Sequence, residues 1–144
     1  MDSRRLCETA AAANVMLCDG EGQVSDIEVC PEGIARFQNE HANCCVHVNH
    51  YLPPGFAAYE ANSLPDPCPR LDRMRVLIQE NWGKITVEVM KRIFADHHGD
   101  SGGICRHGAE NMHSISSYIA EPAKGVLHVR RGHGCLGTWQ AYEV

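Results

Sequence analysis

The stretch VMLCDGEGQVSDIEVC, residues 15–30, decides the architecture of the N-terminal part of the chain. Its Asp19-Gly20 pair is typical of a tight hairpin turn, because these residues accept the backbone angles that such a turn needs. From Val24 to Cys30, alternate side chains point to opposite faces, which is the period of a β-strand. We therefore predict a hairpin of two antiparallel strands over residues 15–18 and 24–30.

Turn signals on either side extend this hairpin into a meander. Pro31-Glu32-Gly33 predicts a second turn, followed by strands over 34–38 and 43–48. Upstream, the alanine-rich residues 4–13 favour a helix, because alanine has the highest intrinsic helix propensity.

The C-terminal part reads as helices followed by strands. Apolar residues at helical spacing begin at Leu71 and end at Ile78, and a second helix over 86–95 has Thr86 as its expected N-cap. The closing segments predict strands over 114–120, 125–131 and 138–144. This order predicts an α+β fold with antiparallel sheets and segregated helices, forming a single domain or half-domain over residues 1–144.

Composition narrows the function classes. The 144 residues carry a net charge of −5, whereas nucleic-acid binding needs a basic surface, so we expect no nucleic-acid partner. The sequence has no apolar run of the roughly 18–20 residues that span a membrane, and its N-terminus does not resemble a secretion signal. We therefore expect a cytoplasmic protein without a membrane partner.

Eight cysteines and nine histidines raise the question of a metal site. There is no C-x-x-C pair, and the densest group consists of Cys44, Cys45, His47 and His50. A strand there would place only Cys45 and His47 on one face, and free cysteines also serve as small buried apolar residues. Metal binding therefore remains an alternative, and we assign no metal and no cofactor. A disulfide framework is not expected without an export signal.

Two irregular segments concentrate polar side chains where chemistry can occur. Asn49 at a strand end can donate its amide to a developing oxyanion, and Arg106 can pair with a substrate carboxylate. Each also has a structural alternative, as a backbone-bonding asparagine or an ion-pair partner. Cys105 lies next to Arg106, which favours a lowered thiol pKa, but no base is identifiable. His97 and His98 are expected on the loop surface.

Four short motifs together resemble a known family. They are HVNH at 47–50, DPCPRLDRM at 66–74, IFADHH at 93–98 and ICRH at 104–107. In this order they resemble the C-terminal half of the acyl-coenzyme A:6-aminopenicillanic-acid acyltransferase family, cysteine peptidase family C45. The resemblance covers nearly the whole chain, including the 14–29 hairpin. Departures from the family pattern occur at Val48, Pro67 and Gly103.

The resemblance implies an N-terminal-nucleophile hydrolase with an αββα sandwich. Such enzymes expose a cysteine by self-cleavage, and this cysteine attacks an amide or thioester carbonyl to form an acyl-enzyme. By resemblance, Asn49 is the oxyanion donor, and Arg106, His50 and Arg70 bind a small acyl substrate, with acyl-coenzyme A among the candidates. The family's nucleophile lies upstream of the matched motifs, which implies that this chain is the C-terminal portion of such an acyltransferase or amidohydrolase.

Two other functions remain open. One is a non-catalytic remnant or binding module of the same fold, and the other is a Cys/His metal protein.

A chain that lacks the upstream half of the fold leaves strand edges uncovered. Whether it is part of an enzyme or a binding module, we therefore expect it to associate with the upstream half or with itself as a homodimer.

Overall fold

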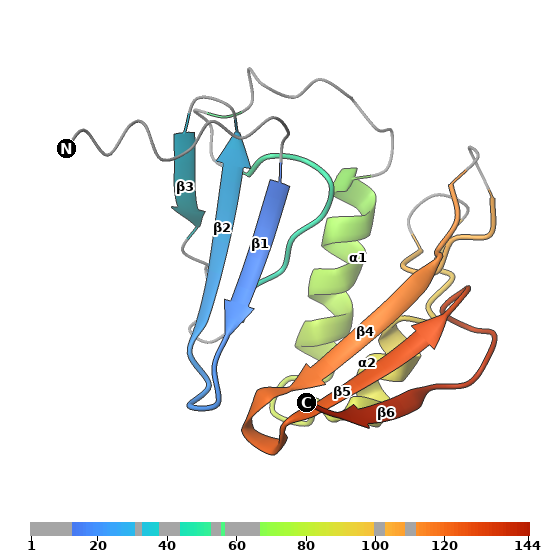
Figure 1. The fold of residues 1–144 in the computed structure, drawn as a ribbon. Helices are drawn as coiled ribbons and strands as arrows, with labels where there is room; N and C mark the ends of the chain where they lie inside the picture. The colour runs from blue at the N-terminus through green and yellow to red at the C-terminus, as the bar shows by residue number, and fades with distance from the viewer. Residues whose placement is uncertain are drawn as a thin grey trace. The chain divides into compact units, whose positions relative to one another are not determined.

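The computed structural model describes residues 13–30, 33–37, 44–52, 56, 67–99, 103–108 and 112–144. Contacts divide the chain into two compact units, Met1–Leu64 and Pro65–Val144. Each unit contains one antiparallel three-stranded sheet, and both described α-helices belong to the second unit (Figure 1). The predicted α+β class is confirmed, whereas the αββα sandwich and the single domain stay predictions.

The sheet of the first unit is a meander. Its strands β1 (Ala13–Cys18), β2 (Val24–Cys30) and β3 (Gly33–Phe37) pair in the order β1-β2-β3, so β2 is central. The strand predicted over 24–30 is confirmed with the same ends. The ends of its two neighbours differ from the prediction by one or two residues.

The turn between β1 and β2 is organised by the side chain of Asp19. Its Oδ1 accepts hydrogen bonds from the backbone N–H groups of Glu21 and Gln23, both at 2.9 Å. Gly22 has a φ of +84°, a left-handed conformation that glycine adopts without steric cost. The predicted hairpin is therefore confirmed.

One face of β2 is buried and carries two carboxylates. Asp26, Glu28 and Cys30 are each 0% exposed, while the residues between them are partly exposed. Burying a carboxylate is costly unless other groups bond to it. The groups that bond to these two carboxylates therefore fix the position of the segments that carry them.

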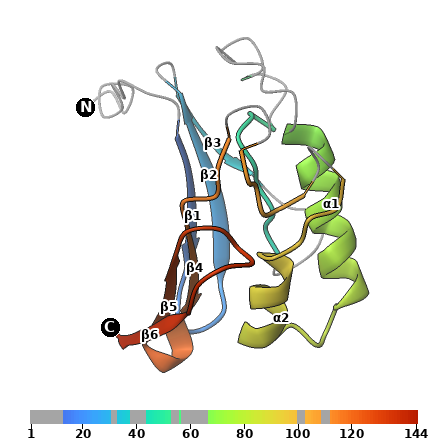
Figure 2. The ribbon, with the colours of Figure 1, turned by 90° about the vertical axis from the view of Figure 1, so that its right-hand side faces the viewer.

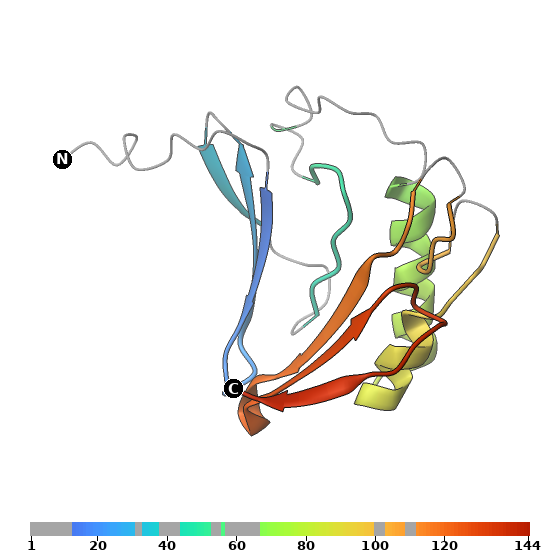
Figure 3. The same ribbon diagram turned by 45° about the vertical axis from the view of Figure 1, so that its right-hand side comes forward.

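The predicted fourth strand is wrong, because residues 44–48 form no strand. The side chain of Glu28 on β2 bonds His47 and the Leu52 backbone N–H, so the segment is tied to the sheet by side-chain contacts and not by strand pairing. The segment instead lies beside the sheet of β1–β3 (Figures 2 and 3) and is held by side chains. One of these is Tyr51, whose hydroxyl donates to the Val29 carbonyl at 3.1 Å.

In the second unit, helices α1 (Pro67–Glu80) and α2 (Val87–Ile93) follow the predicted pattern. Thr86 is the N-cap of α2, and its side chain accepts a hydrogen bond from the Val89 backbone N–H at 3.3 Å. Leu71, Val89 and Ile93 are buried. Both predicted helices are confirmed, although α2 ends two residues earlier than expected.

The second sheet consists of β4 (Ser116–Glu121), β5 (Val126–Arg131) and β6 (Gln140–Glu143), in the order β4-β5-β6. The predicted turn between β4 and β5 is a short 3-10 helix, η4 (Pro122–Lys124), closed by Gly125 at a φ of +62°. Both α-helices lie on the same side of this sheet (Figures 2 and 3). The three strands predicted here are confirmed; each begins one or two residues later than predicted, β4 ends one residue later and β6 ends one residue earlier.

The helix predicted over 4–13 falls outside the described residues, except for Ala13, which begins β1. Among the helices that the structure describes, none is both long and apolar enough to cross a bilayer.

Candidate functional site

Asn49 lies at the centre of a tight turn in the first unit. The backbone N–H of His50 donates to the Val48 carbonyl at 3.0 Å, which closes the turn around Asn49. Asn49 is exposed and His50 is half-buried. The His50 Nδ1 atom is buried and has no hydrogen-bond partner among the described residues.

A single buried carboxylate oxygen holds both flanks of this turn. The Glu28 Oε1 atom lies 2.7 Å from His47 Nε2 and accepts a hydrogen bond from the Leu52 backbone N–H at 2.8 Å. Since hydrogen bonds to a charged acceptor are stronger than neutral ones, Glu28 fixes the path of the chain before and after Asn49. Asn49 is therefore presented outward from an anchored loop.

Asp26 is the second buried carboxylate on this face of β2. Its Oδ1 accepts a hydrogen bond from the Asn14 side chain on β1. The remaining oxygens, Asp26 Oδ2 and Glu28 Oε2, have no hydrogen-bond partner among the residues that the structure describes. Such under-satisfied buried groups are uncommon in folded proteins.

The other two predicted site residues, Arg70 and Arg106, belong to the second unit. Arg70 lies in the first turns of α1, and burial lowers the pKa of its guanidinium. Arg106 is half-buried in the 103–108 segment. Its backbone N–H donates to Ser114 Oγ at 3.0 Å, and its carbonyl accepts from the Ser114 N–H at 3.1 Å. The structure thus describes the predicted site as two pairs, one in each unit.

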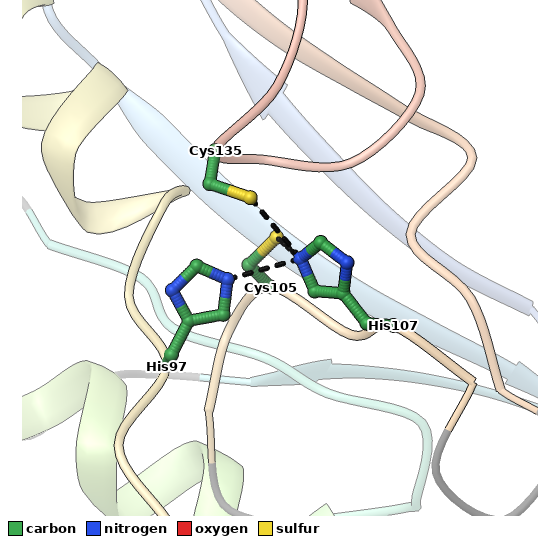
Figure 4. Close-up of side chains that lie close together, drawn as sticks. All are labelled: His97, Cys105, His107 and Cys135. Carbon is green, nitrogen blue, oxygen red and sulfur yellow. Dashed lines mark hydrogen bonds between the residues drawn. The ribbon is translucent and has the colours of Figure 1, made fainter.

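The second unit also brings together four side chains that sequence reasoning did not combine: His97, Cys105, His107 and Cys135 (Figure 4). One ligand atom from each lies within 4.8 Å of every other. The Nε2 atom of His107 is central, at 3.0 Å from His97 Nε2, 3.1 Å from Cys135 Sγ and 3.5 Å from Cys105 Sγ. We call these four residues the Cys/His cluster.

Asp96 fixes the segment that carries His97. Its carboxylate accepts two hydrogen bonds from Arg73 on α1, from Nη2 at 2.6 Å and from Nε at 3.1 Å, and Arg73 lowers the pKa of this carboxyl. The Asp96 carbonyl accepts from the Cys105 backbone N–H at 2.9 Å. The segments bearing two cluster residues are therefore bonded to each other.

The Cys135 loop is held by close backbone approach. A Cβ added at Gly134 would overlap the Phe94 carbonyl and would lie 3.0 Å from Cys105 Sγ, so this position requires glycine. The buried guanidinium of Arg130 donates to the Gly134 carbonyl and, at 3.2 Å, to Ser117 Oγ. These contacts place Cys135 beside Cys105.

His133 supports the cluster from outside. Its ring stacks on the His107 ring, with centroids 4.1 Å apart, and its Nδ1 lies 2.7 Å from the Arg106 carbonyl. His133 therefore contacts both the cluster, through the His107 ring, and the backbone of Arg106, the predicted substrate-binding residue.

Burial and neighbours shift two pKa values in the cluster. The pKa of His107 is lowered, first by desolvation and then by His133, His97 and His113. The pKa of Cys105 is raised, chiefly by burial. The lowered thiol pKa expected beside Arg106 is therefore wrong, because burial disfavours the charged thiolate.

The cluster was missed because its members are far apart in the sequence. His97 and His98 are exposed in a loop, as predicted. The His97 side chain nevertheless points toward Cys105 and His107. The spacing of Cys105 and His107, C-x-H, was the one local signal. Nothing in the sequence pairs it with Cys135.

Comparison with known families fits the motifs described above. The sequence model of the family described as acyl-coenzyme A:6-aminopenicillanic acid acyl-transferase matches residues 4–134. A search of curated proteins gives no match. Because the family match covers most of the chain, the protein belongs to this acyltransferase family.

Proposed function

We propose that the chain forms part of the active site of an acyltransferase or amidohydrolase that cleaves amide or thioester bonds through an acyl-enzyme. The family match over residues 4–134 carries this proposal. The nucleophile is a cysteine on polypeptide upstream of the matched motifs, and this chain is the C-terminal portion that completes the site. Attack by that cysteine forms a tetrahedral intermediate whose oxygen needs hydrogen-bond donors.

Asn49 is the proposed oxyanion donor. Its exposure and its anchored turn support this role, because an oxyanion donor must be accessible to substrate and held in a fixed position. Glu28 acts as a positioning residue, since it bonds His47 and Leu52 on either side of the turn.

Arg106, His50 and Arg70 are the proposed substrate-binding residues. An arginine binds carboxylate or phosphate through its fork of N–H donors, which suits an acid-bearing acyl substrate or the phosphates of acyl-coenzyme A. The framework around the Arg106 backbone, made by Ser114 and His133, would keep this segment in place during binding.

We propose that the upstream polypeptide binds to the first unit at strand β1. The six residues of β1 are all exposed, and Val15, Met16 and Leu17 are 41%, 46% and 52% exposed. An exposed apolar edge strand is prone to pair with another chain. In the absence of the upstream polypeptide, we expect a second copy of this chain to cover the same strand.

The test joins the chain to its upstream coding sequence and compares it with the chain alone. We would incubate each with an acyl-coenzyme A or a β-lactone probe and measure covalent acylation by intact mass. The proposal predicts one acyl group on an upstream cysteine of the joined protein and none on the chain alone. Stoichiometric acylation of a cysteine within the 144 residues would contradict both the upstream nucleophile and the binding-module alternative. Absence of acylation in both proteins would overturn the proposal and support the binding-module alternative.

A further inference from the structure

We propose that His97, Cys105, His107 and Cys135 bind one zinc ion in a tetrahedral site. This proposal concerns the second unit alone and does not depend on the proposed acyl transfer. It assigns a metal to residues that lie in the loops around α2 and β5, outside the Asn49 turn.

The three distances from His107 Nε2 are close to those between ligands of one ion. Zinc binds histidine nitrogen at about 2.0–2.1 Å and cysteine sulfur at about 2.3 Å, so tetrahedral geometry separates two nitrogens by about 3.3 Å and a nitrogen from a sulfur by about 3.6 Å. The distances from His107 Nε2 are 3.0 Å to the His97 nitrogen and 3.1 and 3.5 Å to the two sulfurs. All are within about 0.5 Å of these tetrahedral separations.

Hydrogen bonding alone does not account for this arrangement. A ring nitrogen of histidine offers either one N–H or one lone pair, directed in the plane of the ring. The His107 Nε2 atom nevertheless has three polar neighbours within 3.5 Å, contributed by His97, Cys105 and Cys135. The four side chains converge in Figure 4, and a cation between their ligand atoms would satisfy all of them at once.

The donor set selects the metal. Two sulfurs and two imidazole nitrogens form the Cys₂His₂ combination of structural zinc sites, whereas calcium and magnesium prefer oxygen ligands. Four protein ligands close the coordination sphere, which indicates a structural role rather than activation of water. Two contacts support the ligand positions, because His133 stacks on His107 and Asp96, held by Arg73, belongs to the segment that carries His97.

Such an ion would join three segments that lie far apart in the sequence. His97 follows α2, Cys105 and His107 come from the 103–108 segment, and Cys135 comes from the loop between β5 and β6. The ion would therefore act as a cross-link in place of a larger apolar core, and would hold the Arg106 segment between two of its ligands.

The test uses the full chain without a histidine tag. The protein is purified in reducing buffer, analysed for bound metals, stripped with a chelator and titrated with Co²⁺ and then Zn²⁺. We expect about one equivalent of zinc as purified, one equivalent of Co²⁺ with the intense visible bands of tetrahedral thiolate coordination, and displacement of Co²⁺ by zinc.

Two pairs of variants locate the site. Cys135→Ser and His97→Ala should each weaken Zn²⁺ binding at least about 100-fold, beyond what loss of an outer-shell partner costs. Their matched controls are Cys18→Ser, another exposed free cysteine, and His98→Ala, the exposed neighbour of His97. Both controls should bind zinc like the original protein.

Three results would overturn the proposal. They are less than a tenth of an equivalent of tetrahedral Co²⁺ in folded, reduced protein, unchanged zinc affinity in Cys135→Ser or His97→Ala, and a Cys105–Cys135 disulfide in zinc-free protein isolated without added oxidant. Circular dichroism of each variant shows whether a loss of binding reflects loss of folding.

Discussion

Glu28 Oε1 and His47 Nε2 lie 2.7 Å apart, with 0% and 6% of the respective side chains exposed. The same oxygen accepts the Leu52 N–H, so one buried carboxylate spans the turn that presents Asn49. The positioning of this turn therefore depends on a residue of β2 rather than on strand pairing.

Replacing Glu28 by alanine should destabilise the protein. The substitution leaves the buried His47 ring nitrogen and the Leu52 N–H without their acceptor, which costs about 1–3 kcal/mol in the free energy of unfolding. Urea denaturation measures the loss, and amide exchange at Leu52 should accelerate. Glu28→Gln keeps an accepting oxygen and should cost less; equal losses in the two variants would contradict this assignment.

Replacing Gly134 by alanine should perturb the Cys/His cluster. The added Cβ would overlap the Phe94 carbonyl, and such overpacking typically costs about 1–3 kcal/mol in the free energy of unfolding. Chemical denaturation and zinc titration should both show the effect. Gly33→Ala is the control, because its Cβ would make only an ordinary 4.0 Å contact with Phe56. Unchanged stability and zinc affinity in Gly134→Ala would show that the close approach is not required.

Glu121 should make stability depend on acid pH. Lys124 and then His128 lower the pKa of its carboxyl from 4.5, so its contribution is present above about pH 4.5 and is lost as the pH falls through the lower folded-state value. The melting temperature of Glu121→Gln should therefore be below that of the original protein at pH 7, and the difference should shrink toward pH 3. A difference that grows as the pH falls would contradict this sign.

The exposed strand β1 should cause self-association of the chain alone. Leu17→Lys adds a charge to this edge strand and should shift the protein from dimer or larger species to monomer in sedimentation velocity. Ile115→Lys changes an exposed apolar residue of the second unit, 77% exposed, and should leave the association unchanged. A monodisperse monomer of the unaltered chain would refute the prediction.

Local sequence signals predicted most of the secondary structure and failed where tertiary contacts decide. The Asp19 turn, the strand over 24–30 and the Thr86 cap were predictable because a few neighbouring residues determine each. The strand predicted at 43–48 has β-favouring residues, but the Glu28 side chain of β2 binds His47 of this segment, a contact between residues far apart in the sequence.

The candidate sites were likewise predictable only where neighbouring residues in the sequence form the motif. The family was recognisable because its motifs are short, local and ordered, and the match over residues 4–134 confirms it. The Cys/His cluster was not recognisable, because Cys135 reaches Cys105 and His107 only through the Gly134 contact with Phe94. Asn49, His50, Arg70 and Arg106 remain predicted site residues whose roles await measurement.

The most direct measurement is the acylation rate of the cysteine proposed to lie upstream, in the joined protein, with and without the Asn49 amide. If Asn49 donates to the oxyanion, Asn49→Ala should slow acylation about 100- to 1,000-fold, as loss of one such donor does elsewhere. Asn81→Ala, which removes an amide bonded to the Leu77 carbonyl at the end of α1, should acylate at the original rate. Equal rates in Asn49→Ala and the unaltered protein would contradict the account.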